Sequence, residues 1–290
     1  MHIESTGQKI FKAFNYPILA LLAFVCLYPM LYVVFASFSD PSRYMAHSGA
    51  LTWALGFSTA SYREVFRNPN ILSGYRNTLW ILSVGLVINM FMTVLGSYFI
   101  SRKGLMLWRP VMMLILFTMY FSGGLIPSFL LIQNLGLYDT RWALVLPGAI
   151  STFNMIILRT AMQGVPDSLE ESAKLDGANH FRILFQIILP LVKPTLAVLV
   201  LFYGVSHWNS WFAAMIYLQD RSLFPLQLIL REILIMNDVG GLDVAAGDVE
   251  MVAATIRYAL IIVATVPILT LYPFLQRYFT KGVMIGAVKG

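Results

Sequence analysis

Long uncharged stretches alternate with short polar ones along most of this chain. Five windows contain no Asp, Glu, Lys or Arg: residues 13–39, 77–101, 110–138, 194–219 and 258–276. A shorter window, residues 142–158, continues through 160–166 after a single Arg159. A helix crosses the bilayer core with about 20 apolar residues, and a lone segment there must satisfy its own backbone. The pattern therefore predicts six transmembrane helices.

The composition places the chain in the same class. Hydrophobic residues make up 58% of the 290 positions, and charged residues only 12%. These values are outside the range of soluble globular domains and indicate an all-α polytopic membrane protein. We expect one transmembrane domain over residues 1–290.

The basic residues predict the orientation. An even number of spans puts both termini on one side, and most of the 20 Lys and Arg residues fall in the termini and in the loops after the second and fourth spans. Basic loops stay inside, so both termini are expected in the cytoplasm. The net charge of +6 then reflects topology rather than nucleic-acid binding. We expect membrane lipid to surround the predicted transmembrane helices.

The loops differ in size. Residues 39–76 and 220–257 form two long loops that are expected outside. The large loop expected inside is residues 166–190, which we call the docking loop. It contains EESAKLDGANHFRILFQIILP, a polar and amphipathic stretch in an otherwise apolar chain.

The docking loop carries start and stop signals for two short helices. Asp167 and Glu170 have the spacing of a capping box, which predicts a helix start. Gly177 after Asp176 predicts a helix stop, because glycine readily adopts the left-handed conformation. Pro190 is expected to end the second helix.

The second helix has an apolar pattern. Phe181, Leu184, Phe185 and Ile188 follow at i, i+3, i+4 and i+7, which places them on one predicted face. A helix–turn–helix of this kind is either a surface linker or a docking element for a soluble partner. Periodicity alone does not decide between the two.

The spacing of this stretch resembles the cytoplasmic signature loop of ABC importer permeases. That signature is E-A-A, three residues, Gly, nine residues and I-x-L-P. It is matched here by Glu171, Ser172 and Ala173, then Gly177, then Ile187, Leu189 and Pro190. Asp176 and Ala178 also accompany the pattern. Ser172 in place of the first Ala departs from it.

The resemblance extends over nearly the whole chain. FSGGLIPSFLLIQNLGLYDT, LPGAISTFNMIILRTAMQGVP and the terminal RYFTKGVMIGAVKG are similar to carbohydrate importers, and specifically to the shorter permease subunit of the maltose type. This branch handles oligosaccharides and polysaccharide fragments. The resemblance implies the ABC type I importer permease fold in the inner (plasma) membrane of a bacterium. It also implies a second permease subunit, a cytoplasmic ATPase dimer and an extracytoplasmic sugar-binding protein as partners.

The resemblance implies that another subunit supplies the energy. The chain has no G-x-x-x-x-G-K-[ST] phosphate loop, so ATP and Mg are expected at the partner ATPase and no cofactor is expected on this chain. The expected ATPase-docking residues are Glu170, Glu171, Ser172, Ala173, Asp176, Gly177, Ala178, Phe181, Phe185, Ile187, Leu189 and Pro190.

The fifth window contains candidates for sugar contact in FYGVSHWNSWF. If this window forms one continuous helix, five of its side chains share one arc: Tyr203, Ser206, His207, Ser210 and Trp211. Asn209 then lies at the edge of this arc, and Trp208 lies on the opposite side. Polar groups at membrane depth tend to face a cavity. Membership of Trp208 and Trp211 in the outer aromatic belt is an equally open interpretation. Asn154 and Asn89 are further candidates, although an interhelical hydrogen bond explains either.

Two other classes remain as alternatives. An intramembrane enzyme is conceivable from Glu170 and Glu171 with Lys174 and His207, but there is no H-E-x-x-H, and His207 falls toward the opposite membrane face. An autonomous secondary transporter predicts charged residues inside the spans, and five windows have none. His207 without a second histidine nearby, and a single Cys26, predict no metal site and no internal disulfide.

Overall fold

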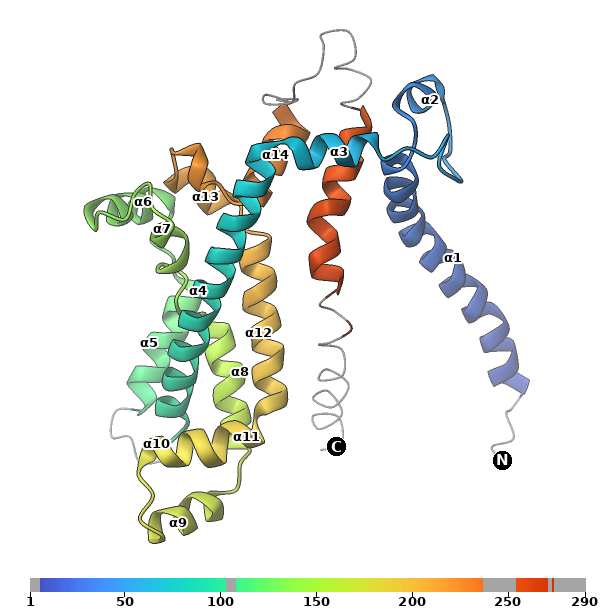
Figure 1. The fold of residues 1–290 in the computed structure, drawn as a ribbon. Coiled ribbons are helices and arrows are strands. Elements are labelled where there is room, and N and C mark those ends of the chain that lie inside the picture. Colours follow the sequence, from blue (N-terminus) through green and yellow to red (C-terminus); the bar gives the residue numbers. More distant parts are fainter. Residues whose placement is uncertain (1–5, 103–107, 237–253, 271–272, 274–290) are drawn as a thin grey trace. The chain divides into compact units, whose positions relative to one another are not determined.

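The computed structural model describes residues 6–102, 108–236, 254–270 and 273 (Figure 1). In these ranges the regular secondary structure is helical, with one isolated bridge between Ser39 and Phe57. The chain divides into two compact units, Met1–Pro69 with Glu232–Val266 and Asn70–Arg231 with Pro267–Gly290. The terminal segment 277–290 and residues 237–253 of the second long loop lie outside the described residues.

The first unit contains α1 (Thr6–Ser37), α2 (Pro41–Ala46), α3 (Ala60–Arg67) and the helix Ala254–Thr270 up to Val266. Hydroxyl groups join its segments. Tyr44 donates to the hydroxyl of Tyr258 at 2.8 Å and lies 2.9 Å from the hydroxyl of Tyr32, and Ser61 Oγ donates to Thr255 Oγ1 at 2.9 Å. Burial is the main cause that raises the pKa of Tyr44 well above its ordinary value, and the hydrogen bonds with Tyr258 and Tyr32 add to this shift. The phenol is therefore neutral at physiological pH.

Two described helices are long and apolar enough to cross a membrane: Phe11–Ser37 within α1, and α4 (Pro69–Ser101). They account for the first two predicted spans. The third window, residues 110–138, is not one continuous helix. It forms α5 (Trp108–Tyr120) and α6 (Leu125–Asn134), which meet at 108°. Gly124 at the break has φ +89°, a value that glycine adopts without strain.

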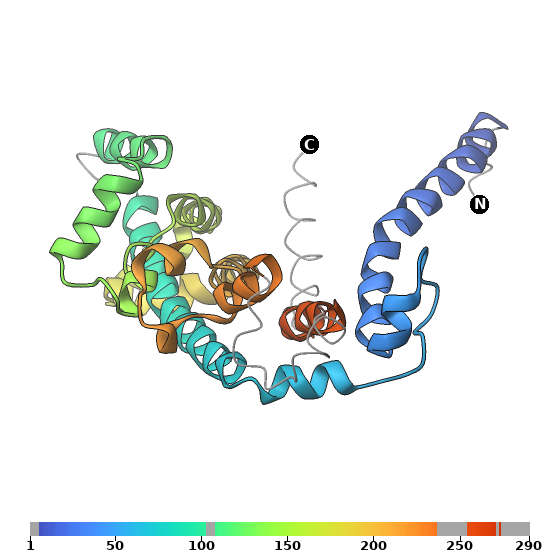
Figure 2. The ribbon, with the colours of Figure 1, turned by 90° about the horizontal axis from the view of Figure 1, so that it is seen from above.

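The fourth and fifth windows are interrupted as well. Residues 142–158 contain α7 (Trp142–Val145) and the start of α8 (Thr152–Gln163), with Pro147 and Gly148 between them. Residues 194–219 contain most of α12 (Lys193–Trp208) and all of α13 (Phe212–Tyr217). The helices α5 and α12 both pack against α8 (Figures 1 and 2). The second unit also includes η2 (Arg221–Leu223) and the start of α14 (Leu226–Met236).

A stripe of buried polar side chains runs along α4, and we call it the α4 polar face: Asn77, Thr78, Asn89, Thr93 and Ser97, each at most 2% exposed. All but Thr78 follow a spacing of four, with Ile81 and Gly85 at the intervening buried positions. Residues four apart in a helix are neighbours, and each step of four adds about 40° of rotation. The polar face is therefore a continuous stripe that winds partly around the helix.

The α4 polar face binds backbone atoms near the helix breaks. Asn77 Nδ2 donates to the carbonyls of Ser222 and Phe224 at 2.7 and 3.0 Å, and the amide of Leu226 donates to Thr78 Oγ1 at 2.9 Å. Asn89 Nδ2 donates to the carbonyls of Gly148 and Ala149 at 2.6 and 3.1 Å. An unpaired backbone group away from water is costly, so these contacts stabilise the breaks.

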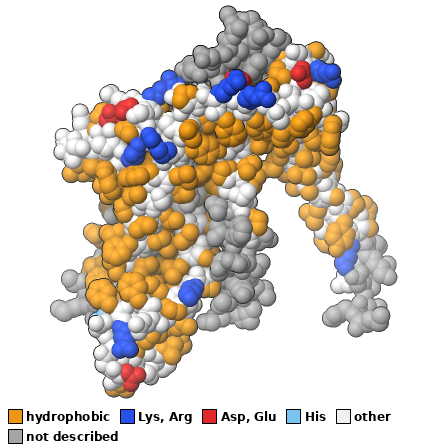
Figure 3. Space-filling model, in the orientation of Figure 1, with side chains coloured by type: hydrophobic (Ala, Val, Ile, Leu, Met, Phe, Trp, Pro, Cys, Tyr) orange, Lys and Arg blue, Asp and Glu red, His pale blue; other side chains and the backbone are white. Residues whose placement is uncertain are grey.

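Apolar side chains remain exposed on the outside of the helices. Figure 3 shows them over much of the visible face, with Lys and Arg mainly near its ends. Met113, Leu114 and Phe117 of α5, for example, are 57–72% exposed. Such a surface fits contact with lipid or another subunit.

Asn89→Leu tests the role of the α4 polar face. The variant removes the donor to the carbonyls of Gly148 and Ala149 and should lower the stability of the purified protein in detergent by about 1–3 kcal/mol. Ser83→Ala on the exposed side of α4 is the matched control, because the Ser83 hydroxyl donates to carbonyls of its own helix. Thermal unfolding measures both. Equal melting temperatures for the two variants would contradict this role.

Candidate functional site

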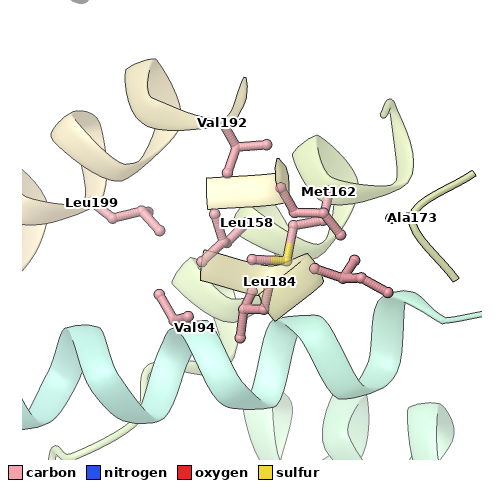
Figure 4. Close-up of a cluster of buried hydrophobic side chains, with 9 residues drawn as sticks. Val94, Leu158, Met162, Ala173, Leu184, Val192 and Leu199 are labelled. Carbon is pink, nitrogen blue, oxygen red and sulfur yellow. The ribbon is translucent and has the colours of Figure 1, made fainter. Parts of the chain in front are cut away.

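The docking loop is packed into the second unit through an apolar cluster (Figure 4). The cluster joins α4, α8, α9 (Asp167–Leu175), the helical segment after Gly177, and α12. Its buried members are Val94, Leu158, Met162, Ala173, Ile183, Leu184, Ile188, Val192 and Leu199. Docking-loop residues thus share a core with the membrane helices, and the loop is an integral part of this unit.

Gly177 ends α9 as the sequence predicts. Its φ is +78°, in the left-handed region. The amide of Ala178 donates to the carbonyl of Ala173 at 2.9 Å, and the amide of Gly177 to that of Lys174 at 3.0 Å. This pair of bonds is the Schellman motif. A Cβ built on Gly177 meets nothing within 4 Å, so the constraint on this position is conformational and not steric crowding.

The predicted capping box is wrong. The helix α9 begins at Asp167 itself, with Pro166 as the N-cap and no side-chain cap hydrogen bond. Because Asp167 lies inside the helix, it does not have the extended backbone that an N-cap residue uses. Glu170 instead forms ion pairs with Arg102 and with Lys174, the latter at 3.1 Å.

The partner Arg102, directly after α4, was not among the predicted site residues. Arg102 donates hydrogen bonds from Nε and Nη2 to Ser101 Oγ, and the Arg102 guanidinium lies 4.8 Å from the ring centre of Tyr98. Burial lowers the pKa of Arg102, while Tyr98 and Asp167 oppose that shift. Arginine remains charged throughout the physiological range.

The second part of the docking loop departs from a regular α-helix. It consists of α10 (His180–Arg182), a π-helix η1 (Ile183–Ile188) and α11 (Leu189–Leu191). The wider turn changes the expected apolar face: Leu184 and Ile188 are buried, whereas Phe181 and Phe185 are 67% and 51% exposed. The helical segment ends at Leu191, one residue beyond Pro190, and bends by 85° into α12.

The docking residues divide by exposure into a surface and a support. The exposed ones are Glu171, Ser172, Asp176, Gly177, Phe181, Phe185 and Pro190. Glu170, Ala178, Ile187 and Leu189 are partly buried, and Ala173 is buried. Leu175, which the motif does not include, is 90% exposed beside the turn. The exposed residues can contact another protein, and the others hold them in place.

The predicted arc in the fifth window does not exist as one helical face. The helix α12 ends at Trp208, with Asn209 as its C-cap, and α13 begins at Phe212. Ser210 and Trp211 therefore lie in the break, not on the helix that carries Tyr203, Ser206 and His207.

Tyr203 and His207 are held against α4 by hydrogen bonds. The Tyr203 hydroxyl lies 2.7 Å from Thr93 Oγ1 and accepts from the amide of Ser151 at 3.0 Å. His207 Nε2 lies 2.6 Å from Asn89 Oδ1. Gly85 leaves the space for the ring, since a Cβ there would come within 2.6 Å of His207 Nε2.

The remaining candidates have different surroundings. Ser206 and Asn209 are exposed, and Asn154 is buried in the first turn of α8. Trp211 is partly buried and has the guanidinium of Arg231 4.0 Å from its ring centre. Within the described ranges, no three His, Cys, Asp or Glu side chains are grouped so as to hold a metal ion.

Comparison with known proteins identifies the family. Residues 2–285 match the binding-protein-dependent transport system inner membrane component, and the chain belongs to this family. It is therefore a permease subunit of the bacterial inner membrane.

Two relatives from Bacillus subtilis match the chain almost from end to end. The polygalacturonan/rhamnogalacturonan transport system permease protein YtcP is 39% identical, covering 98% of this chain and 99% of the relative. Protein LplC is 37% identical, covering 100% and 98%.

The structural comparison gives the same fold. A bacterial ABC transporter involved in the import of the acidic polysaccharide alginate has a chain that is 29% identical, with a TM-score of 0.89 and coverage of 96% of this chain and all of the other. A second alginate transporter structure, at 16% identity and a TM-score of 0.62, supports the fold alone. The chain thus has the ABC importer permease fold.

Tyr203→Phe tests whether the Tyr203 hydroxyl holds α12 to its neighbours. Removing it leaves Thr93 and the amide of Ser151 without this partner, and the expected loss of stability is about 1 kcal/mol. Ser206→Ala, exposed on the same helix, should leave the melting temperature unchanged. A melting temperature of Tyr203→Phe equal to that of Ser206→Ala would show that the hydroxyl has no such role.

Proposed function

We propose that this chain is one of two different permease subunits in an ATP-driven importer that moves a sugar into the cytoplasm by alternating access. The observation that carries the proposal is the docking loop, which presents an exposed surface from a base packed into the membrane helices. A displacement of such a loop moves the helices with it. The six spans and the cytoplasmic position of both termini belong to this proposal.

The partners follow from the same arrangement. A cytoplasmic ATPase dimer binds ATP and Mg and contacts the docking loop, because this chain has no phosphate loop of its own. An extracytoplasmic binding protein delivers the sugar. The description of the family as binding-protein-dependent supports a partner of this kind.

The docking surface combines charged and aromatic contacts. Phe181 and Phe185 are the apolar anchors for a cleft in the ATPase, and Glu171 and Asp176 supply exposed carboxylates. Hydrophobic anchors with charges around them are typical of helix-in-groove recognition. Gly177 sets the angle between the two parts of the loop.

The substrate is an oligosaccharide or a fragment of a polysaccharide, and an acidic one is favoured. The relative named for polygalacturonan and the neighbour named for alginate both handle polymers of uronic acids. In this chain, Trp211 and Arg231 pair an aromatic surface with a cation. Sugar rings stack on aromatic surfaces, and guanidinium groups bind carboxylates. Ser206 and Asn209 are exposed polar groups at the same end of α12.

The first test reconstitutes the complete complex in liposomes with the binding protein outside. Labelled oligogalacturonate or alginate oligosaccharide should accumulate only with ATP, and a neutral oligosaccharide of the same length is the specificity control. Uptake driven equally well by an ion gradient without ATP would refute the importer and indicate a secondary transporter.

Gly177→Val tests the docking assignment. A β-branched residue in the left-handed region costs about 1 kcal/mol or more and redirects the following helix. The variant should insert and pair with the second permease but bind the ATPase weakly and lose sugar-stimulated hydrolysis. Co-purification and ATPase assays measure these effects.

Gly177→Asn is the matched control, because asparagine tolerates the left-handed conformation and the surrounding space is open. It should retain most of the coupling. In addition, Ala178→Cys in a Cys26→Ala background should cross-link to a cysteine in the ATPase cleft. If Gly177→Val retains full coupling and no cleft position cross-links, the docking assignment is wrong and the loop is only a surface linker.

A further inference from the structure

The docking loop follows α8 and precedes α12 along the chain, but α4 is not its neighbour in sequence. The Arg102–Glu170 ion pair joins residues 68 positions apart and connects the end of α4 to the first turn of α9. Both side chains are mostly buried, with 20% and 13% exposed. A shielded ion pair of this kind is weakened by water and salt far less than a surface pair.

Two neighbouring side chains fix the position of the Arg102 guanidinium. Arg102 donates from Nε and Nη2 to Ser101 Oγ at 3.1 and 3.0 Å, and its guanidinium lies over the Tyr98 ring. These contacts come from the last turn of α4 itself. A displacement of Glu170 therefore acts on a side chain whose position relative to α4 is fixed.

The ion pair lies at a cavity rather than in dense packing. The cavity has a volume of about 290 Å³, and its lining includes Arg102, Glu170, Met162, Gln163 and Lys174. Apolar contacts such as that of Val94 with the cluster, which have no fixed direction, and an exposed hydrogen bond between the Tyr98 hydroxyl and His180 Nδ1 at 3.2 Å also connect α4 to the loop. The ion pair is directional and joins two particular points.

We propose that the Arg102–Glu170 ion pair couples movement of the docking loop to α4. The inference rests on the proposed function, since it concerns how ATPase closure reaches the helices. The helix α4 carries the polar face that binds the backbone near the helix breaks, so its displacement reaches residues 148–149 and 222–226. Arg102 and Glu170 are positioning residues in this mechanism. They do not contact sugar or nucleotide.

The test uses the complete reconstituted complex and measures sugar imported per ATP hydrolysed. Arg102→Gln and Glu170→Gln should each retain ATPase binding but lower this ratio by about fivefold or more, the lower end of typical coupling between sites. The charge reversal Arg102→Glu with Glu170→Arg should restore the ratio to near the wild-type value. Gln163→Ala, another change at the cavity, should leave it unaltered.

The outcomes separate this inference from the proposed function. A wild-type complex without ATP-dependent uptake would overturn the proposed function itself. With a functional wild type, three results would overturn the coupling role alone: an unchanged ratio in both single variants, loss of ATPase binding in them, or failure of the reversed pair to restore the ratio. Melting temperatures identify a variant that is merely unfolded. In that case the import ratio of the reversed pair decides whether the ion pair has the coupling role.

Discussion

The need to pair backbone groups where helices break in an apolar surrounding determines much of this structure. The second unit contains several such breaks, and near each one amides or carbonyls lack a partner in their own helix. The α4 polar face supplies partners for two of them: Asn89 for the break after α7, and Asn77 with Thr78 for the break between η2 and α14. One regular helix thereby permits its neighbours to be irregular.

The same helix also connects the two regions of functional interest. In the second half of α4, Asn89 and Thr93 hold His207 and Tyr203 of α12, next to exposed polar groups. Val94, the residue after Thr93, and Arg102, directly after the last turn, contact the docking loop. In the importer that we propose, a rigid element that contacts both regions transmits displacement without local unfolding.

Sequence reasoning identified what depends on local chemistry. The helices α1 and α4 follow from long apolar runs, and the stop at Gly177 follows from the conformation of glycine. Hydropathy does not predict how sharply a span breaks, because it registers composition, and a break is stable only when another segment pairs its backbone. Arg102 was missed because no periodic pattern links positions 68 apart. The spacing of four along α4 was available and marks Thr93 and Ser97 as buried; it was not used.

The α4 polar face also has a consequence for synthesis of the protein in the cell. The helix α4 is complete at residue 101, whereas the hydrogen-bonding partners of its polar face lie between residues 141 and 226. A nascent chain therefore has to keep two asparagines and several hydroxyl groups at the translocon, or bound to a chaperone, until more than 100 further residues have emerged. Release of α4 alone into lipid would leave these groups without partners, so the order of synthesis makes its departure from the translocon late.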